Sequence, residues 1–338
     1  MPRFFIRTRG ASAQAVAAVA SAFALSCIPV PTQAQQAKVD ATADRPPIRL
    51  IVPFAAGTPT DMIARTLGQD LAASLKRAVV VDNRPGAAGG IGTEAVVNAA
   101  PDGQTLLLTV NSTVTINPLL YGKLRYDPMK DLAPVAMVAL GGYVLVASPQ
   151  SGHKDVAGLV RAAKARPSAI NYASYGTGSM SHMCGEVFQA MHGVKLFHVP
   201  YKAGSLNDIL GGQVELGFEP IGPTIPHVQS GKLAALAVTT PERVDAMPGV
   251  PPMAESTAGY QCTAWVGVLA PARTPAELRS ALADAVLRIA STPKFANQMK
   301  DIGGLAAMPA NAEQFAQIVR QDHDKWAKVV KPLNIQLD

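Results

Sequence analysis

The sequence predicts an α/β protein of two domains, with mixed, mostly parallel sheets covered by helices. Three observations support this class. Short, nearly all-apolar runs alternate with amphipathic runs, as in parallel sheets covered on both faces. The 338 residues exceed what one hydrophobic core usually serves. Apolar residues make up 48% of the chain and charged residues 16%, which is a globular composition.

The elements follow from this alternation. We expect strands at 48–54, 78–83, 105–110, 135–140 and 143–148, with helices at 60–76 and 90–100. A second run follows, with helices at 157–165 and 179–193 and strands at 170–174, 195–201, 215–218, 233–240 and 265–271. The remainder is predicted to be all helical and includes a capping-box start at Asn311–Gln314. The chain is expected to cross between the domains near 140–148 and to return near 262–270.

Residues 1–34 have the pattern of a secretory signal peptide. Arg3, Arg7 and Arg9 precede an apolar run, and Ala34 ends a cleavage-site pattern. Cys27 as a lipoprotein anchor is the minor alternative, because Leu25 stands at the wrong offset for a lipobox. Removing this segment removes three arginines and no acid, so the net charge falls from +6 to +3. No later run reaches 18 apolar residues, so a soluble periplasmic protein is expected.

Several function classes find no support in the sequence. Aromatic residues are 5% of the chain and no basic cluster alternates with them, which argues against nucleic-acid binding. No G-x-S-x-G elbow occurs, and the six histidines lack metal-ligand spacing. We therefore expect no enzyme, no cofactor and no metal site. For Cys184 and Cys262, a disulfide and buried free thiols both remain open.

The stretch around Gly57 joins the first strand to the first helix through small residues. Thr58 is predicted to cap this helix, with Pro59 in its first turn and Asp61 as the acid of a capping box. Because a helix N-terminus binds anions through free N–H groups, the loop is predicted to hold a carboxylate. Two interpretations of Asp61 stay open, a cap alone or a cap that also forms part of the binding site.

The second domain repeats this arrangement. A strand ends at Ser174, a Tyr-Gly-Thr-Gly turn follows, and a helix starts near Ser179. His182 is interpreted as a hydrogen-bonding residue of the helix start rather than as a catalytic base. Two such helix N-termini facing each other across a cleft would suit an extended molecule with a carboxylate at one or both ends.

The motifs together resemble the Bug family, the extracytoplasmic solute-binding proteins of tripartite tricarboxylate transporters. The matching pieces include IRLIVPFAAGTPTD, VVVDNRPGAAGGIGTEAV, YASYGTGSMSH, HVPYKAG and DILGGQVELGF. The resemblance implies a two-lobed fold like that of type II periplasmic binding proteins, with a ligand cleft between the lobes. It places lobe 1 at 35–143 and 266–338 and lobe 2 at 144–265. It further implies a monomer that captures a small organic acid for the membrane subunits of such a transporter; the alternative is a sensor component for a membrane kinase.

The resemblance also implies a set of ligand-binding positions in the strand-to-helix loops of both lobes. These are Phe54, Ala55, Ala56, Gly57, Thr58, Asp61, Ser112, Thr113, Ser174, Tyr175, Thr177, Gly178, Ser179, His182, Tyr201, Lys202 and Glu219. The chain departs from the family pattern at Tyr175, where a small serine is frequent, and after Lys202, where the loop is shorter. The pattern leaves open whether the Tyr175 ring contacts ligand or packs at the rim.

Overall fold

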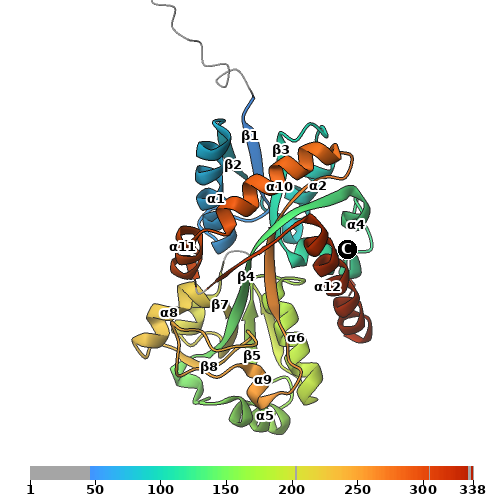
Figure 1. The fold of residues 1–338 in the computed structure, drawn as a ribbon. Helices are drawn as coiled ribbons and strands as arrows, with labels where there is room; N and C mark the ends of the chain where they lie inside the picture. Colours follow the sequence, from blue (N-terminus) through green and yellow to red (C-terminus); the bar gives the residue numbers. More distant parts are fainter. Residues whose placement is uncertain (1–45, 202–203, 304, 334–335, 338) are drawn as a thin grey trace, which may run out of the picture. The chain divides into compact units, whose positions relative to one another are not determined.

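The computed structural model describes residues 46–201, 204–303, 305–333 and 336–337 (Figure 1). The predicted signal peptide, Cys27 and Lys202 lie outside the described residues. Ten strands form one sheet in the order β2-β1-β3-β9-β4-β7-β5-β6, with β8 and β10 pairing with β4. Among the described residues, no helix combines the length and apolarity needed to cross a membrane.

Three parallel strands at one end of this order form what we call the first trio. The central strand β1 (Ile48–Val52) pairs with β2 (Val79–Asn83) and with β3 (Thr105–Val110). Helix α1 (Pro59–Leu75) connects β1 to β2, and α2 (Gly90–Val97) connects β2 to β3. Successive side chains of a strand point to opposite faces, so Leu50 and Ile51 enter two different apolar clusters.

Three parallel strands at the other end form the second trio. Strand β5 (Asn171–Ser174) pairs with β6 (Phe197–Pro200) and with β7 (Leu216–Pro220). Helix α5 (Val156–Ala165) precedes β5, and α6 (Met180–His192) connects β5 to β6. Each trio therefore has its first strand in the centre, and its strands end at one common edge.

Between the trios the pairing is antiparallel. Strand β4 (Leu132–Ala147) pairs with β9 (Thr263–Pro271) and β10 in its first part, and with β7 and β8 (Ala234–Val238) in its second. Figure 1 shows β4 running between the two trios. Two separate strands were predicted here, but the chain continues as one through Gly141 and Gly142. With five antiparallel pairs and four parallel ones, the expectation of mostly parallel pairing was wrong.

The C-terminal part contains three helices and one strand. Helices α10 (Ala276–Ala290) and α11 (Pro293–Gly303) precede β10 (Ala306–Ala310), and α12 (Ala312–Leu333) follows. The prediction of an all-helical tail was wrong at β10, which forms because β4 offers it a free edge. The predicted capping box is confirmed, since the backbone and side chains of Asn311 and Gln314 bond reciprocally.

Shorter helices fill the remaining connections. They are α3 (Asn117–Leu120), α4 (Pro128–Asp131), α7 (Leu206–Leu210), α8 (Ile221–Gln229) and α9 (Met253–Ser256). Helix α8 was not predicted, because Pro223 and Pro226 interrupt the helical pattern of its sequence. Its first turn packs against α11, where Gly222 and Gly303 meet backbone to backbone.

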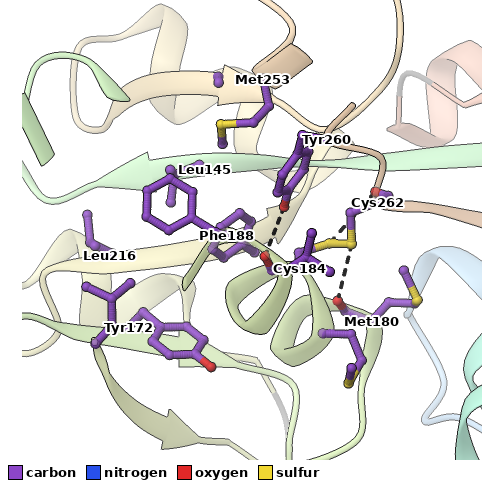
Figure 2. Packing of buried hydrophobic residues seen from close by; sticks show 14 of the residues in the cluster. Leu145, Tyr172, Met180, Cys184, Phe188, Leu216, Met253, Tyr260 and Cys262 are labelled. Carbon is purple, nitrogen blue, oxygen red and sulfur yellow. Dashed lines mark hydrogen bonds between the residues drawn. A yellow bond between two sulfur atoms is a disulfide. The ribbon is translucent and has the colours of Figure 1, made fainter. Parts of the chain in front are cut away.

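Cys184 and Cys262 form a disulfide inside the apolar cluster beneath α6 (Figure 2). Their Cα atoms are 5.5 Å apart, and the bridge joins α6 to the residue preceding β9. The Tyr260 hydroxyl donates a hydrogen bond to the Cys184 carbonyl at 2.9 Å beside it. Of the two alternatives left open by the sequence, the disulfide is therefore the one present.

Candidate functional site

The first cap loop, residues 54–58, connects β1 to α1. Thr58 is the N-cap residue, and its Oγ1 accepts a hydrogen bond from the Asp61 N–H at 3.4 Å. Gly57 has a φ of +81°, a conformation that side chains oppose, and its N–H donates to Asp61 Oδ2 at 2.9 Å. The Thr58 N–H donates to the Ala55 carbonyl. The predicted cap is confirmed, except that Asp61 accepts from Gly57 rather than from Thr58.

The Asp61 carboxylate is enclosed by donors of the protein. It is 2% exposed, and it also accepts from Arg65 Nε at 3.0 Å and from Asn83 Nδ2 at 2.9 Å. Burial raises the pKa of this carboxyl, but the hydrogen bonds from Arg65, Gly57 and Asn83 outweigh it and lower the pKa. Asn83 Nδ2 further donates to the Phe54 carbonyl. Asp61 therefore holds the loop in shape as an internal anion.

The second cap loop, residues 175–179, connects β5 to α6 with the same pattern. Ser179 is the N-cap residue and its Oγ accepts from the His182 N–H at 3.3 Å. Gly178 has a φ of +83°, and its N–H donates to His182 Nδ1 at 3.2 Å. The Ser179 N–H donates to the Gly176 carbonyl. Three residues of this loop together with His182 of α6 thus repeat the bonds of the first, with histidine in place of aspartate.

His182 is held as a neutral ring. It is 4% exposed, and its ring stacks on that of His198 with centroids 4.1 Å apart. Burial lowers the pKa of His182 to about 3 and that of His198 to about 4. Because Nδ1 accepts the Gly178 N–H, the proton lies on Nε2, which is 3.5 Å from Glu186 Oε1. The predicted role of His182 as a hydrogen-bonding residue of the helix start is confirmed.

A buried carboxylate connects the loops of the second trio. Glu219, on β7, is 1% exposed and accepts hydrogen bonds from Ser205 Oγ and, at 3.1 Å, from the Tyr175 hydroxyl. Burial raises the pKa of Glu219. The Tyr201 N–H donates to the Ser174 carbonyl at 2.9 Å, which brings the end of β6 to the end of β5. The hydrogen bond to Glu219 thus holds the Tyr175 side chain in position.

The loops of the first trio converge in the same way. A Cβ on Gly89 would lie 2.4 Å from Thr113 Cγ2 and 3.4 Å from Pro53 Cβ, so the segments after β1, β2 and β3 touch. Thr113 is buried and its Oγ1 lies 2.7 Å from Thr109 Oγ1. Ser112 is also buried and begins a π-helical turn, Ser112–Ile116.

Both cap loops contain backbone amides without a partner among the described residues, those of Phe54, Ala55 and Ala56 in the first and that of Thr177 in the second. Among the described residues, none accepts a hydrogen bond from the N–H of Ala56 or of Thr177. These two residues occupy equivalent positions, each two residues before the N-cap. Unpaired N–H groups at a helix N-terminus favour an anion, because they add to the positive end of the helix dipole.

Comparison with known proteins identifies the family to which this architecture belongs. The model of the tripartite tricarboxylate transporter family receptor matches residues 63–335. The chain belongs to this receptor family. It is 35% identical to Protein BugT of Bordetella pertussis strain Tohama I over 301 residues, which covers 86% of this chain and 90% of BugT. The resemblance seen in the sequence is therefore confirmed, and the family is one of solute-binding receptors rather than of enzymes.

Solved structures give the fold of the receptor. The periplasmic binding protein BugD is 34% identical, with a TM-score of 0.78 over 86% of this chain and 98% of BugD. Rpa4515 of R. palustris, solved with adipate, is 30% identical with a TM-score of 0.79 over 84% and 96%. MatC of Rhodopseudomonas palustris, solved with malate, is 30% identical with a TM-score of 0.75 over 84% and 98%. These neighbours confirm the predicted class, a two-lobed periplasmic-binding-protein fold.

The positions expected from the sequence lie at the ends of strands and around the start of α6. The first cap loop and Asp61 lie at the end of β1, and Ser112 and Thr113 lie at the end of β3. Tyr175, Thr177, Gly178, Ser179 and His182 surround the start of α6, with Ser174, Tyr201 and Glu219 on the adjoining strand ends. Within these positions, the carboxylates of Asp61 and Glu219 and the ring of His182 are buried supports rather than exposed groups.

Several residues that shape the receptor's loops were not singled out by the sequence. Arg65 and Asn83 complete the set of hydrogen-bond donors around Asp61. Ser181 Oγ accepts from the Tyr175 N–H at 2.9 Å. The turn after β2 has four consecutive residues of positive φ, 86–89, and the Asn117 side chain donates to the Ala88 carbonyl at 3.0 Å. The Gly-rich sequence of this turn was the signal from which its positive φ values could have been predicted.

Proposed function

We propose that the receptor binds a small organic carboxylate between the two cap loops and delivers it to the membrane subunits of a tripartite tricarboxylate transporter. The observation that carries the proposal is the pair of equivalent helix starts, each with an unpaired amide two residues before its N-cap, at Ala56 and at Thr177. Adipate and malate in two related structures support this ligand class. We assign Ser112 and Thr113 to the same site in lobe 1, and Tyr175 and Tyr201 in lobe 2.

The side chains indicate how such a ligand would be recognised. Beside the first cap loop the Arg65 guanidinium bonds Asp61 and Asn83, so recognition there falls to backbone N–H groups. In the second cap loop, His182 is neutral, so the dipole of α6 and the Thr177 amide supply the positive potential. A carboxylate at each end of the ligand would then meet one helix start.

The lobe division expected from the sequence is retained as part of this proposal. Lobe 1 comprises 35–143 and 266–338, and lobe 2 comprises 144–265. Strand β4 changes partners between Gly142, which pairs with Thr263, and Tyr143, which pairs with Pro220. A boundary near residue 143 agrees with this change, and limited proteolysis with and without ligand would locate it.

Export and stoichiometry belong to the proposal as well. We expect cleavage after Ala34, a free receptor in the periplasm and a monomer in solution. N-terminal sequencing of the exported protein and light scattering would test these statements. A lipid on Cys27 or a stable dimer would contradict them.

Calorimetry on refolded protein tests the ligand class. The chain is unfolded in denaturant to remove carried-over ligand, refolded, and titrated with monocarboxylates, malate, adipate, citrate and aromatic acids. We expect saturable binding of at least one acid, which chromatography then recovers unchanged. Absence of heat from the whole panel with folded protein would overturn the proposal, and conversion of the acid would indicate an enzyme.

A matched pair of variants tests the amide itself. Thr177→Pro removes the N–H, whereas Thr177→Ala removes only the side chain. We expect binding to weaken by about tenfold or more in the proline variant, equal to the loss of one charge-assisted hydrogen bond, and to persist in the alanine variant. Equal affinities of both variants would remove this amide from the site.

A further inference from the structure

A half-buried carboxylate on the C-terminal helix contacts the segment that follows β3. Asp322, on α12, accepts hydrogen bonds from Thr115 Oγ1 at 2.7 Å and from Trp265 Nε1 at 3.2 Å on one oxygen. Its other oxygen accepts from Trp326 Nε1 at 3.0 Å. Trp265 and Trp326 are the two tryptophans of the chain, and both are buried. One side chain thus joins α12, β9 and the turn after β3.

The turn that Asp322 contacts contains two residues of the proposed binding site. Thr115 belongs to the π-helical segment Ser112–Ile116, which begins with Ser112 and Thr113. Its Oγ1 is also 2.9 Å from the Asn111 carbonyl, at the end of β3. Single π-helical turns are rare and occur frequently at functional sites. A charged acceptor 207 residues away in the sequence bonds this turn through Thr115.

The surroundings of Asp322 make the interaction costly to lose. Burial raises the pKa of this carboxyl, while Thr115, the charge of Lys325, and Asn111 and Trp265 act in the opposite direction. The Asn111 amide donates to the Thr263 carbonyl at 3.1 Å, which joins the end of β3 to the first residue of β9. Hydrogen bonds to a charged group contribute more than neutral ones, so the cluster restrains the turn strongly.

We propose that Asp322 is a positioning residue that holds the Ser112–Ile116 segment in its ligand-binding conformation. It acts through Thr115 and touches no ligand itself. The inference rests on the proposed function, because Ser112 and Thr113 are assigned to the site there. Trp265 extends its effect to β9, one of the two strands that connect the lobes.

Four variants of the full, disulfide-bonded chain separate this role from general stability. Asp322→Asn replaces the charged acceptor, and Thr115→Val removes only the hydroxyl that links it to the turn. Trp326→Phe removes the bond within α12 and keeps both partners of the Thr115–Asp322 bond. Asp324→Asn is the control, because its side chain is 79% exposed on the same helix.

Hydrogen exchange of amides 111–116 in the ligand-free chain is the first measurement. We expect exchange to rise by about tenfold in Asp322→Asn and Thr115→Val, as for the loss of one such hydrogen bond. Trp326→Phe and Asp324→Asn should leave these amides unchanged. Unchanged exchange in Asp322→Asn would overturn the proposal, as would an equal rise in α1, which would show only a general loss of stability.

Calorimetry with malate and adipate is the second measurement. We expect Asp322→Asn and Thr115→Val to weaken binding of whichever acid the wild-type chain binds by about tenfold, while both controls keep wild-type affinity. Equal affinity of all four variants would overturn the positioning role. If the wild-type chain bound neither acid, the titration would use the acid identified with the full panel; if it bound no acid of the panel, the proposed ligand class would fail, and the exchange data would still decide whether Asp322 positions the turn.

Discussion

The two cap loops have the same backbone arrangement but different chemistry at the third residue of the helix. In the first, the Gly57 N–H meets a carboxylate, Asp61, which is supported by Arg65 one turn further on. In the second, the Gly178 N–H meets the neutral ring of His182, with Glu186 one turn further on. Loop geometry therefore depends on an acceptor at this position and not on its charge. The ionisable group at this position decides how the stability of each loop depends on pH.

The loops also differ in how their helices are anchored. The Cys184–Cys262 disulfide ties α6 to the start of β9, closing a separation of 78 residues. Replacing both cysteines by alanine should lower the free energy of unfolding by about 4 kcal/mol, because the unfolded chain regains the entropy of a long loop. Urea unfolding measures this loss. A loss below about 1 kcal/mol would contradict a structural role for the bridge.

Changing the charge of the acceptor in each loop tests this comparison directly. His182→Asp places a carboxylate at a buried position that faces Glu186, so the free energy of unfolding should fall by about 3 kcal/mol at pH 7. Asp61→Asn keeps the shape of its side chain and should lose about 2 kcal/mol, because three hydrogen bonds lose their charged acceptor. Urea unfolding compares the two variants. A His182→Asp variant as stable as the wild type would show that the loops are insensitive to charge.

Acid should affect the second cap loop before the first. The pKa of His182 is lowered to about 3 and that of His198 to about 4, whereas unfolded histidine titrates near about 6.5. Below that pH the unfolded chain binds more protons than the folded chain, so stability falls as pH drops, by up to about 1.4 kcal/mol per unit for each histidine. The lowered pKa of Asp61 has an effect only below about 3.9.

Unfolding in urea between pH 7.5 and 4.5 measures this difference. His198→Gln should flatten the acid slope relative to the wild type, since one buried histidine no longer takes up a proton on unfolding. Asp61→Asn should leave the slope unchanged over the same range and lower the curve uniformly. Parallel curves for His198→Gln and the wild type would contradict the assignment of neutral stacked rings.

The smallest expected effect concerns the turn after β2, which gives the first trio a third loop. Ala88 has a φ of +49°, a left-handed conformation that costs a residue with a Cβ more than it costs glycine. Ala88→Gly should therefore raise the free energy of unfolding by about 0.5 kcal/mol, after the added flexibility of the unfolded chain is included. Thermal unfolding would detect the gain, and a loss of similar size would show that the turn is unstrained.

Much of the fold was predictable because its signals are local. The strands around Leu50, Leu107 and Tyr172 and the caps at Thr58 and Ser179 depend on residues within one turn of each other. The hydrogen bonds that hold the candidate site in shape, by contrast, join residues far apart in the sequence. Asn83 bonds Asp61 across 22 residues, Tyr175 bonds Glu219 across 44, and Thr115 bonds Asp322 across 207. No periodicity or spacing reports such pairs.

By itself, the sequence determined the α/β alternation, the two capped helix starts and the Gly-rich turns, because propensity, capping and φ preference act between neighbouring residues. The tertiary structure alone decided that β4 continues through Gly141 and Gly142, that β10 adds a strand, and that Cys184 pairs with Cys262. The tertiary structure also decided which acidic side chains are buried among hydrogen-bond donors. Burial and long-range hydrogen bonds set these outcomes, and both exist only after distant segments have packed.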